Sequence, residues 1–169
     1  MNKQQANPAF LQLIEQNRGI IFKICNSYCA SKNDREDLAQ EIIYQLWKSG
    51  NNFDGNYKFT TWMYRIALNV AISFYRKTAK NSATVSLSEG DIDIEDKTGE
   101  GYETEENFRL LQQAVNELKE LDRALMILYL EAKSYREIAE VTGLTETNVA
   151  TRINRIKDKL KQKLLTVNK

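Results

Sequence analysis

Histidine does not occur in this chain of 169 residues, and its absence excludes several kinds of catalytic site. Without an imidazole there is no Ser-His-Asp or Cys-His nucleophile, no HExxH zinc helix and no Glu-x-x-His di-iron bundle. An enzyme would have to rely on carboxylates, and the candidate is a helical metal site at Glu36, Asp37 and Glu41. No second carboxylate motif completes that site, so the sequence predicts neither an enzyme nor a bound metal or other cofactor.

Long hydrophobic runs are also missing, and none reaches the roughly 18 residues that a membrane-spanning helix requires. The N-terminal stretch MNKQQANPAFLQLIEQN lacks the charged, apolar and small-residue pattern of a secretory signal. We therefore expect a cytoplasmic protein that does not insert directly into a membrane.

Cysteine is scarce, since only Cys25 and Cys29 occur, four residues apart in an apolar helical pattern. Two thiols at this spacing are more often inert core residues than a redox or metal-binding pair. The sequence alone leaves both interpretations open.

Net charge is close to zero, with 24 basic residues against 23 acidic ones, but the charges are unevenly distributed. Residues 84–107 contain nine acids and one lysine, a net charge of −8, so the rest of the chain carries +9. The last twenty residues, 150–169, contain seven basic residues and one acid, a net charge of +6. The chain thus combines an acidic middle with a basic end.

Apolar residues recur at helical rather than alternating spacing, so the sequence predicts an all-α fold without strands. We expect a first helix over about 8–30, a second that Asp34 caps and that ends near Ser49, and an aromatic-rich third over about 60–79. These helices make one small helical domain over residues 1–80.

Four further helices are expected in a second small domain over residues 106–169. Residues 81–105 between the two domains are polar, acidic and contain glycine. A segment of this composition cannot bury enough apolar surface to offset its ordering entropy, which predicts a flexible acidic linker.

The segment from Ser134 to Leu160 has the layout of a helix-turn-helix. A capping box formed by Ser134 and Glu137 begins a short helix, and Gly143 ends it at a turn that requires a positive φ. Thr145 then caps the last helix. A helix pair of this kind occurs both in DNA-binding proteins and in proteins that bind no DNA.

The last helix is expected to pack through one apolar stripe and to expose its opposite face. The stripe consists of Val149, Ile153, Ile156, Leu160 and Leu164. The opposite face carries short polar groups and two guanidinium groups, namely Thr147, Asn148, Thr151, Arg152, Asn154 and Arg155, and basic residues from Lys157 onwards flank it. These groups suit base edges and phosphates in a major groove, and the alternative is an ordinary amphipathic helix with a solvated basic tail.

Aromatic residues are concentrated in residues 57–77, which hold six of the chain's sixteen. A stripe at steps of four is expected to dock this helix on the core: Trp62, Ile66, Val70 and Phe74. The surplus rings are Tyr57, Tyr64 and Tyr75, and the cations Lys58, Arg65, Arg76 and Lys77 lie among them. Such rings either form a stacking surface for unpaired bases or are half-buried tyrosines with a structural role.

The preceding helix has an organised polar face in addition to its apolar one. That face carries Asp37, Gln40, Glu41, Tyr44 and Lys48, with Trp47 at its border. A large ring beside ordered charges is typical of a protein-binding surface, and the alternative is a solvated face with a half-buried tryptophan.

Taken in order, these three segments resemble the bacterial sigma factors of the extracytoplasmic-function group. The segment that grips the clamp coiled coil of core RNA polymerase in that family is similar to DREDLAQEIIYQLW. The segment that melts and reads the minus-ten element is similar to KFTTWMYRIALNVAISFYRK. The helix-turn-helix that reads the minus-thirty-five element is similar to SYREIAEVTGLTETNVATRINRIKDKL.

The resemblance implies a promoter-specificity factor that captures a base flipped out of the non-template strand. Such a factor uses binding energy to hold the DNA open and catalyses no reaction. Its partners would be the clamp coiled coil and flap of core RNA polymerase, duplex and single-stranded promoter DNA, and a cognate anti-sigma factor. The linker would run through the polymerase toward the RNA exit path. The alternative is a helix-turn-helix transcription regulator that acts without polymerase, its N-terminal domain binding a ligand or a second copy.

The resemblance also assigns residues to each surface. Minus-ten DNA would contact Tyr57, Lys58, Phe59, Trp62, Tyr64, Arg65, Asn69, Arg76 and Lys77. Minus-thirty-five DNA would contact Thr147, Asn148, Thr151, Arg152, Arg155 and Lys157. Core polymerase would contact Asp37, Gln40, Glu41, Tyr44, Trp47 and Lys48. Two positions depart from the family pattern, because Ser73 replaces a common aspartate and Ala150 replaces a common basic residue, so base preference is expected to differ.

Overall fold

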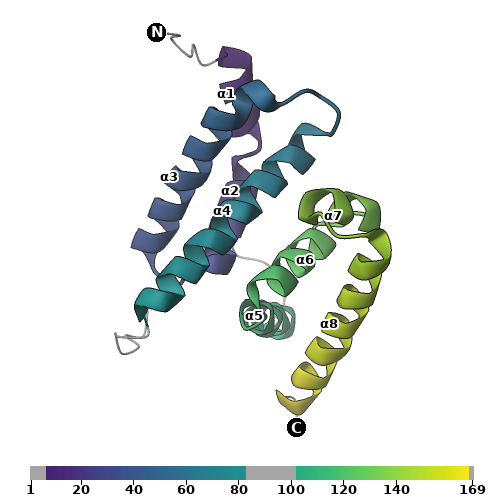
Figure 1. Ribbon diagram of the computed structural model, residues 1–169. Coiled ribbons are helices and arrows are strands. Elements are labelled where there is room, and N and C mark those ends of the chain that lie inside the picture. Colours follow the sequence, from purple (N-terminus) through teal and green to yellow (C-terminus); the bar gives the residue numbers. More distant parts are fainter. Residues whose placement is uncertain (1–6, 83–101, 168–169) are drawn as a thin grey trace. The chain divides into compact units, whose positions relative to one another are not determined.

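A computed structural model describes residues 7–82 and 102–167 of the chain (Figure 1). All regular elements within these residues are helices, which confirms the predicted all-α fold. The described helices form two compact units, one in each half of the chain. No helix in either described range is long and apolar enough to cross a membrane.

The N-terminal unit is a bundle in which three helices pack on one another in pairs. Its elements are α1 (Pro8–Gln16), α2 (Arg18–Tyr28), α3 (Lys32–Ser49), the 3-10 turn η1 (Gly50–Asn52) and α4 (Phe59–Ser82). Figure 1 shows α3 and α4 as the long helices of this unit, with α2 packed against them. Fully buried branched side chains from α2 and α3 fill the space between the helices: Ile24, Leu38, Ile42 and Leu46.

The expected single helix over residues 8–30 is wrong, because Asn17 divides it into α1 and α2. Asn17 has a non-helical backbone with φ −110° and ψ 17°. Its side-chain amide donates a hydrogen bond of 2.8 Å to the carbonyl oxygen of Leu13. Asparagine competes in this way with the helical backbone, so α1 ends at Gln16 and α2 begins at Arg18.

The cap of α3 also differs from the prediction, since Ser31 and not Asp34 occupies the N-cap position. The hydroxyl oxygen of Ser31 accepts a hydrogen bond of 3.1 Å from the backbone N–H of Asp34. Asp34 lies in the first turn, where its carboxylate faces the positive end of the helix dipole. Serine and aspartate both favour the N-cap position, so the sequence offered two candidates. The helix begins at the earlier one, directly after the bend that follows α2.

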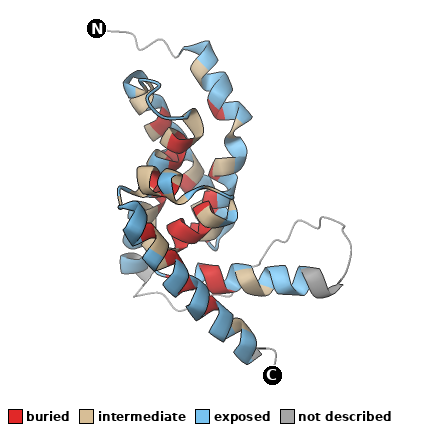
Figure 2. Cartoon of the chain, turned by 90° about the vertical axis from the view of Figure 1, so that its right-hand side faces the viewer, coloured by how far each residue is buried: buried red, intermediate tan, exposed pale blue. Residues whose placement is uncertain are grey.

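The buried face of α4 is not the predicted stripe. The residues that α4 buries most are Thr61, Met63, Tyr64, Ala67, Leu68 and Ala71. The predicted docking residues Trp62, Ile66, Val70 and Phe74 are all only half-buried. Figure 2 colours the chain by how far each residue is buried. One position along a helix is a rotation of about 100°, so the true face is one position further along the chain. Alanines on that face allow α4 to approach its neighbours closely.

The described part of the C-terminal unit contains four helices, and α8 packs on each of the other three. They are α5 (Tyr102–Asn116), α6 (Glu120–Leu130), α7 (Tyr135–Thr142) and α8 (Glu146–Val167). The predicted stripe of α8 is confirmed over Val149, Ile153, Ile156 and Leu160, all buried, and Leu164 is half-buried. Of the predicted linker 81–105, both ends are helical, since α4 reaches Ser82 and α5 begins at Tyr102. Its remainder, 83–101, lies outside the described residues.

Both cysteines lie in the core of the N-terminal unit, with exposed fractions of 3% for Cys25 and 7% for Cys29. Burial raises the pKa of Cys25 to about 11 and that of Cys29 to about 12. In the described ranges, no three acidic or cysteine side chains are grouped in a way that could hold a metal ion. The core interpretation of the cysteines is the one that the structure supports.

The native protein is expected to resist thiol-modifying reagents at pH 8. Roughly one Cys25 thiol in a thousand is ionised at that pH when its pKa is about 11, and the thiolate is the reactive form. Absorbance on reaction with a chromogenic disulfide would report two equivalents only after denaturant is added. Rapid reaction of either thiol in the native protein at pH 8 would contradict the burial of both.

Candidate functional site

The helix-turn-helix of the C-terminal unit is built from three local hydrogen-bonded devices. The Ser134 hydroxyl accepts from the Glu137 N–H at 3.1 Å, and the Glu137 carboxylate accepts from the Ser134 N–H at 2.9 Å. Gly143 ends α7 with φ 76°, a conformation that costs a residue with a side chain. Thr145 caps α8 by accepting from the Asn148 N–H at 3.1 Å. The predicted capping box, turn glycine and cap are all confirmed.

The face of α8 opposite its buried stripe is exposed, as the sequence predicts. Its exposed residues are Thr147, Asn148, Thr151, Asn154, Arg155 and Lys157, and Arg152 is half-buried. The polar side chains on this side of the helix can form hydrogen bonds with base edges, and the cations near its middle can contact phosphate oxygens. The arrangement is suited to entering a major groove.

Two of these cations contact α6 through side chains that the sequence analysis missed. The guanidinium group of Arg152 forms an ion pair with the Asp122 carboxylate at 3.4 Å. The Lys157 ammonium group donates a hydrogen bond of 3.2 Å to the Tyr129 hydroxyl and lies 5.1 Å from the ring centroid. That hydrogen bond raises the pKa of Lys157 above its ordinary value. The partners are about 30 residues apart in sequence and follow no local pattern.

Four aromatic rings meet where α1, η1 and the start of α4 come together. Trp62 has its ring centroid 5.3 Å from Phe53, 5.6 Å from Phe59 and 5.6 Å from Phe10. Phe59 is 5.6 Å from Phe53 and 5.9 Å from Phe10. We call these four residues the ring cluster. Trp62 and Phe59 were predicted as site residues, whereas Phe10 and Phe53 were missed because neither lies in the aromatic segment 57–77.

The three surplus tyrosines of the aromatic segment have different environments. Tyr57 is 49% exposed in the loop before α4, but Tyr64 is only 2% exposed. Tyr75 is half-buried, with its ring centroid 6.2 Å from that of Tyr28. The prediction that Tyr64 belongs to an exposed stacking surface is therefore wrong, because its position follows Met63 on the buried face of α4.

The predicted polar and charged residues of the aromatic segment lie on its outside. Lys58, Arg65, Asn69, Arg76 and Lys77 are exposed, as is Ser73, where the family pattern has aspartate. Together with Tyr57 they offer a flat ring, an amide and cations to a ligand. This combination fits unpaired bases and their phosphates.

The outer face of α3 carries all six residues predicted for protein binding, and each is exposed: Asp37, Gln40, Glu41, Tyr44, Trp47 and Lys48. The rings of Tyr44 and Trp47 lie side by side, with centroids 6.4 Å apart. Ile43, which the sequence analysis missed, is 45% exposed beside Tyr44. An apolar centre surrounded by charges is the usual composition of a protein interface.

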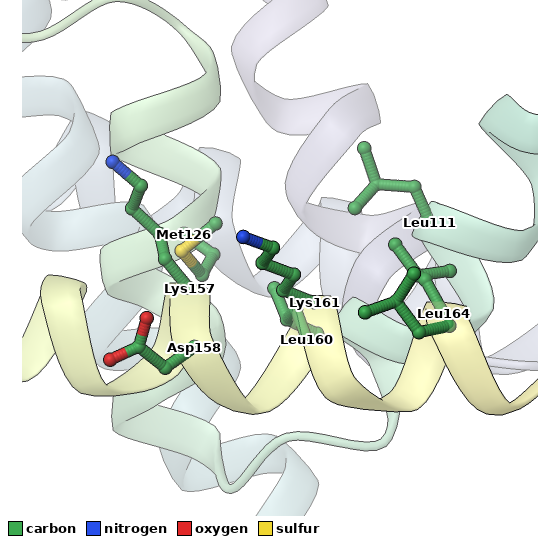
Figure 3. A pocket seen from close by; sticks show the side chains of 8 residues that line it. Leu111, Met126, Lys157, Asp158, Leu160, Lys161 and Leu164 are labelled. Carbon is green, nitrogen blue, oxygen red and sulfur yellow. The ribbon is translucent and has the colours of Figure 1, made fainter.

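The C-terminal unit also contains an open groove of about 540 Å³ that the sequence did not indicate (Figure 3). Its apolar lining comes from α5, α6 and α8, and the side chains of Lys157 and Lys161 extend beside it. It was missed because three separate helices supply its walls.

Comparison with known proteins gives the same two regions. Residues 13–81 match the family model for sigma-70 region 2, and residues 108–160 match the model for sigma-70 region 4. The ECF RNA polymerase sigma factor SigW of Bacillus subtilis is 28% identical, with 96% of this chain and 92% of SigW covered. The RNA polymerase sigma factor YlaC of the same organism is 30% identical over 76% of each chain.

Two solved structures share the fold. The sigma factor RpoE of Bartonella quintana, in complex with the anti-sigma factor NepR, has a TM-score of 0.73 at 20% identity. The alignment covers 96% of this chain and all of RpoE. The structure of CnrH in complex with the cytosolic domain of CnrY has a TM-score of 0.68 at 21% identity, covering 98% of this chain and 94% of CnrH.

Proposed function

The chain belongs to the extracytoplasmic-function group of the sigma-70 family and is a promoter-specificity factor of RNA polymerase, and we propose that three of its surfaces divide that work. The outer face of α3 binds core polymerase. The start of α4 and the loop before it hold melted minus-ten DNA. The exposed face of α8 reads the minus-thirty-five element.

The observation that carries this proposal is the fully capped helix-turn-helix with its exposed polar and cationic face. Arg152 and Lys157 are held to α6, so their charged groups start from defined positions instead of a wide set of rotamers. Arg155 and Asn148 lie exposed on the same face. Phosphate contacts by the cations orient the helix, and contacts to base edges give specificity.

Two further features follow from the family. Sigma factors recognise DNA and bind polymerase, and we propose no covalent chemistry for this chain. The two solved structures compared above each contain a partner: RpoE is bound to the anti-sigma factor NepR, and CnrH to the cytosolic domain of CnrY. We propose that a cognate anti-sigma factor also binds this chain. A regulator acting without polymerase is not favoured, because the relatives that match are polymerase sigma factors.

Reconstitution with core RNA polymerase tests the proposed function directly. Core enzyme with this chain is expected to start transcription at promoters selected from genomic DNA, and core enzyme alone is not. The same chain without core enzyme should give no specific footprint on those promoters. A specific footprint in the absence of polymerase, with no gain in transcription in its presence, would support the stand-alone regulator instead.

Replacing Arg152 with alanine should weaken holoenzyme binding to a duplex promoter about 10-fold, since one specific base or phosphate contact is worth roughly 1–3 kcal/mol. Binding to a pre-opened template that lacks the upstream element should stay unchanged. Gel-shift titrations on the two templates would measure this difference. Arg136→Ala is the matched control, because its side chain is 78% exposed on α7. Equal losses on both templates would contradict the assignment of α8 to upstream DNA.

A further inference from the structure

One member of the ring cluster, Phe10, lies outside the segment that binds DNA in the proposed function. Phe53, Phe59 and Trp62 belong to the loop and the start of α4, whereas Phe10 belongs to α1. The ring of Phe10 meets those of Phe59 and Trp62 edge to face, at interplanar angles of 84° and 69°. Such contacts are directional, so Phe10 restricts the orientation of both rings.

Gly50 provides the other side of the Phe10 site. A Cβ atom at Gly50 would lie 2.8 Å from Cε1 and 3.0 Å from Cζ of Phe10, which is closer than carbon atoms approach. The backbone of Gly50 is right-handed helical, with φ −57° and ψ −33°, and accepts any residue. The glycine is therefore required for the space it leaves to the phenylalanine ring and not for its conformational freedom.

The loop from Asp54 to Lys58 is held at both ends by this cluster. Phe53 precedes the loop and Phe59 follows it, and their rings meet at 5.6 Å. Within the loop the Asp54 carboxylate accepts a hydrogen bond of 3.0 Å from the Asn56 N–H, and Gly55 has φ 78°. Tyr57 projects from this loop and is 49% exposed. The position of the exposed ring is thus set by contacts that end at Phe10.

We propose that Phe10, seated against Gly50, is a positioning residue for the surface that holds melted promoter DNA. It does not contact DNA. It fixes the orientation of Trp62 and Phe59 and the path of the loop that carries Tyr57, so that bases meet a preformed surface. This inference rests on the proposed function of that surface and adds α1 to it.

Two substitutions disturb the same contact from opposite sides. Phe10→Ala removes the ring, and Gly50→Ala places a methyl group in the space that the ring occupies. Each should lower the affinity of holoenzyme for single-stranded minus-ten DNA about 10-fold, because the loss of one base-stacking contact has roughly that effect. In the double variant Gly50→Ala should add nothing, since no ring remains for the methyl group to displace.

The matched controls are Phe22→Ala and Gly19→Ala. Phe22 is 65% exposed on α2, and a Cβ atom at Gly19 meets nothing within 4 Å. Both controls should bind single-stranded DNA as the unaltered chain does. Phe10→Tyr, which keeps the ring, should restore most of the affinity. Binding to core polymerase and to minus-thirty-five duplex should be unchanged in all variants, measured well below their melting temperatures.

Three outcomes are distinguishable by including Tyr57→Ala and Trp62→Ala. If these direct variants lose single-strand affinity and the Phe10 and Gly50 variants lose it non-additively, the inference holds. If only the direct variants lose it, while Phe10→Ala merely lowers the melting temperature, Phe10 has a structural role and the inference is overturned. If none of the variants loses affinity, this surface does not hold melted DNA, and the proposed function of the surface falls together with the inference.

Discussion

Replacing Trp47 with alanine is expected to weaken binding of the chain to core RNA polymerase by roughly 100-fold, which corresponds to an interface hot spot of about 2–4 kcal/mol. Trp47 and Tyr44 present paired rings on the outer face of α3, and Ile43 extends the apolar area. Burying these rings against a partner removes apolar surface that the free chain leaves in water. Asp37 and Lys48 are exposed on the same helix, and charges of this kind orient a partner more than they add affinity.

Surface plasmon resonance with immobilised core enzyme would measure the loss for Trp47→Ala. Because Trp47 is 36% exposed and outside the bundle core, the fold should survive, and the circular dichroism spectrum should be unchanged. Phe22→Ala is a suitable control, since it removes a large exposed ring from α2 instead of α3. Affinity equal to that of the unaltered chain, or an equal loss in the control, would show that core polymerase binds elsewhere.

Replacing Arg123 with methionine is expected to remove a third or more of the stability of the C-terminal unit. The Arg123 side chain is 3% exposed, and its Nη2 donates to the carbonyl oxygens of Asn116 and Leu118, the latter at 3.0 Å. Asn116 is the last residue of α5, and Leu118 lies in the turn before α6. Carbonyl oxygens at a helix end have no backbone N–H of the same helix to accept from, so the arginine supplies the donor. Two buried hydrogen bonds from a charged donor are worth roughly 3 kcal/mol or more, whereas a helical unit of this size has a total stability of only about 3–9 kcal/mol.

The two units can be followed separately in the full chain. Both tryptophans, Trp47 and Trp62, lie in the N-terminal unit, so tryptophan fluorescence reports that unit and circular dichroism reports both. In Arg123→Met, urea should reduce the helical signal at a lower concentration while the fluorescence transition stays in place. Arg136→Met, at a side chain 78% exposed on α7, should leave both transitions where they are. A fluorescence midpoint that moves with the helical signal would mean that the units unfold as one.

The local devices of this chain could be predicted from its sequence because each involves residues within about one helical turn. Ser134 and Glu137 meet within the first turn of α7, and Thr145 reaches the N–H three residues later. Helical spacing was equally sufficient for α8, where a single apolar stripe faces a polar side. The outer face of α3 followed from the same reasoning.

The face that α4 buries was decided only by the tertiary structure. Apolar residues occupy most of its circumference, and the sequence offered a stripe through Trp62 as readily as one through Met63. Which stripe turns inward depends on how closely α2 and α3 approach, and Ala67 and Ala71 permit the closer packing. Tyr64 is carried into the core with them, which is why spacing alone misplaced it.

Contacts between segments that are distant in the chain likewise could not be predicted from the sequence. Phe10 meets Gly50, and Asp122 meets Arg152, only after helices have packed, and neither pair leaves a periodic signal. The sequence by itself determined most of the helices, the caps of α7 and α8 and the chemical character of the exposed faces, because those depend on local hydrogen bonds and spacing. It did not place the break at Asn17 or the cap of α3 at Ser31. Only the tertiary structure decided which distant residues contact and orient the side chains on those faces, because such contacts depend on distances between elements that are far apart in the chain.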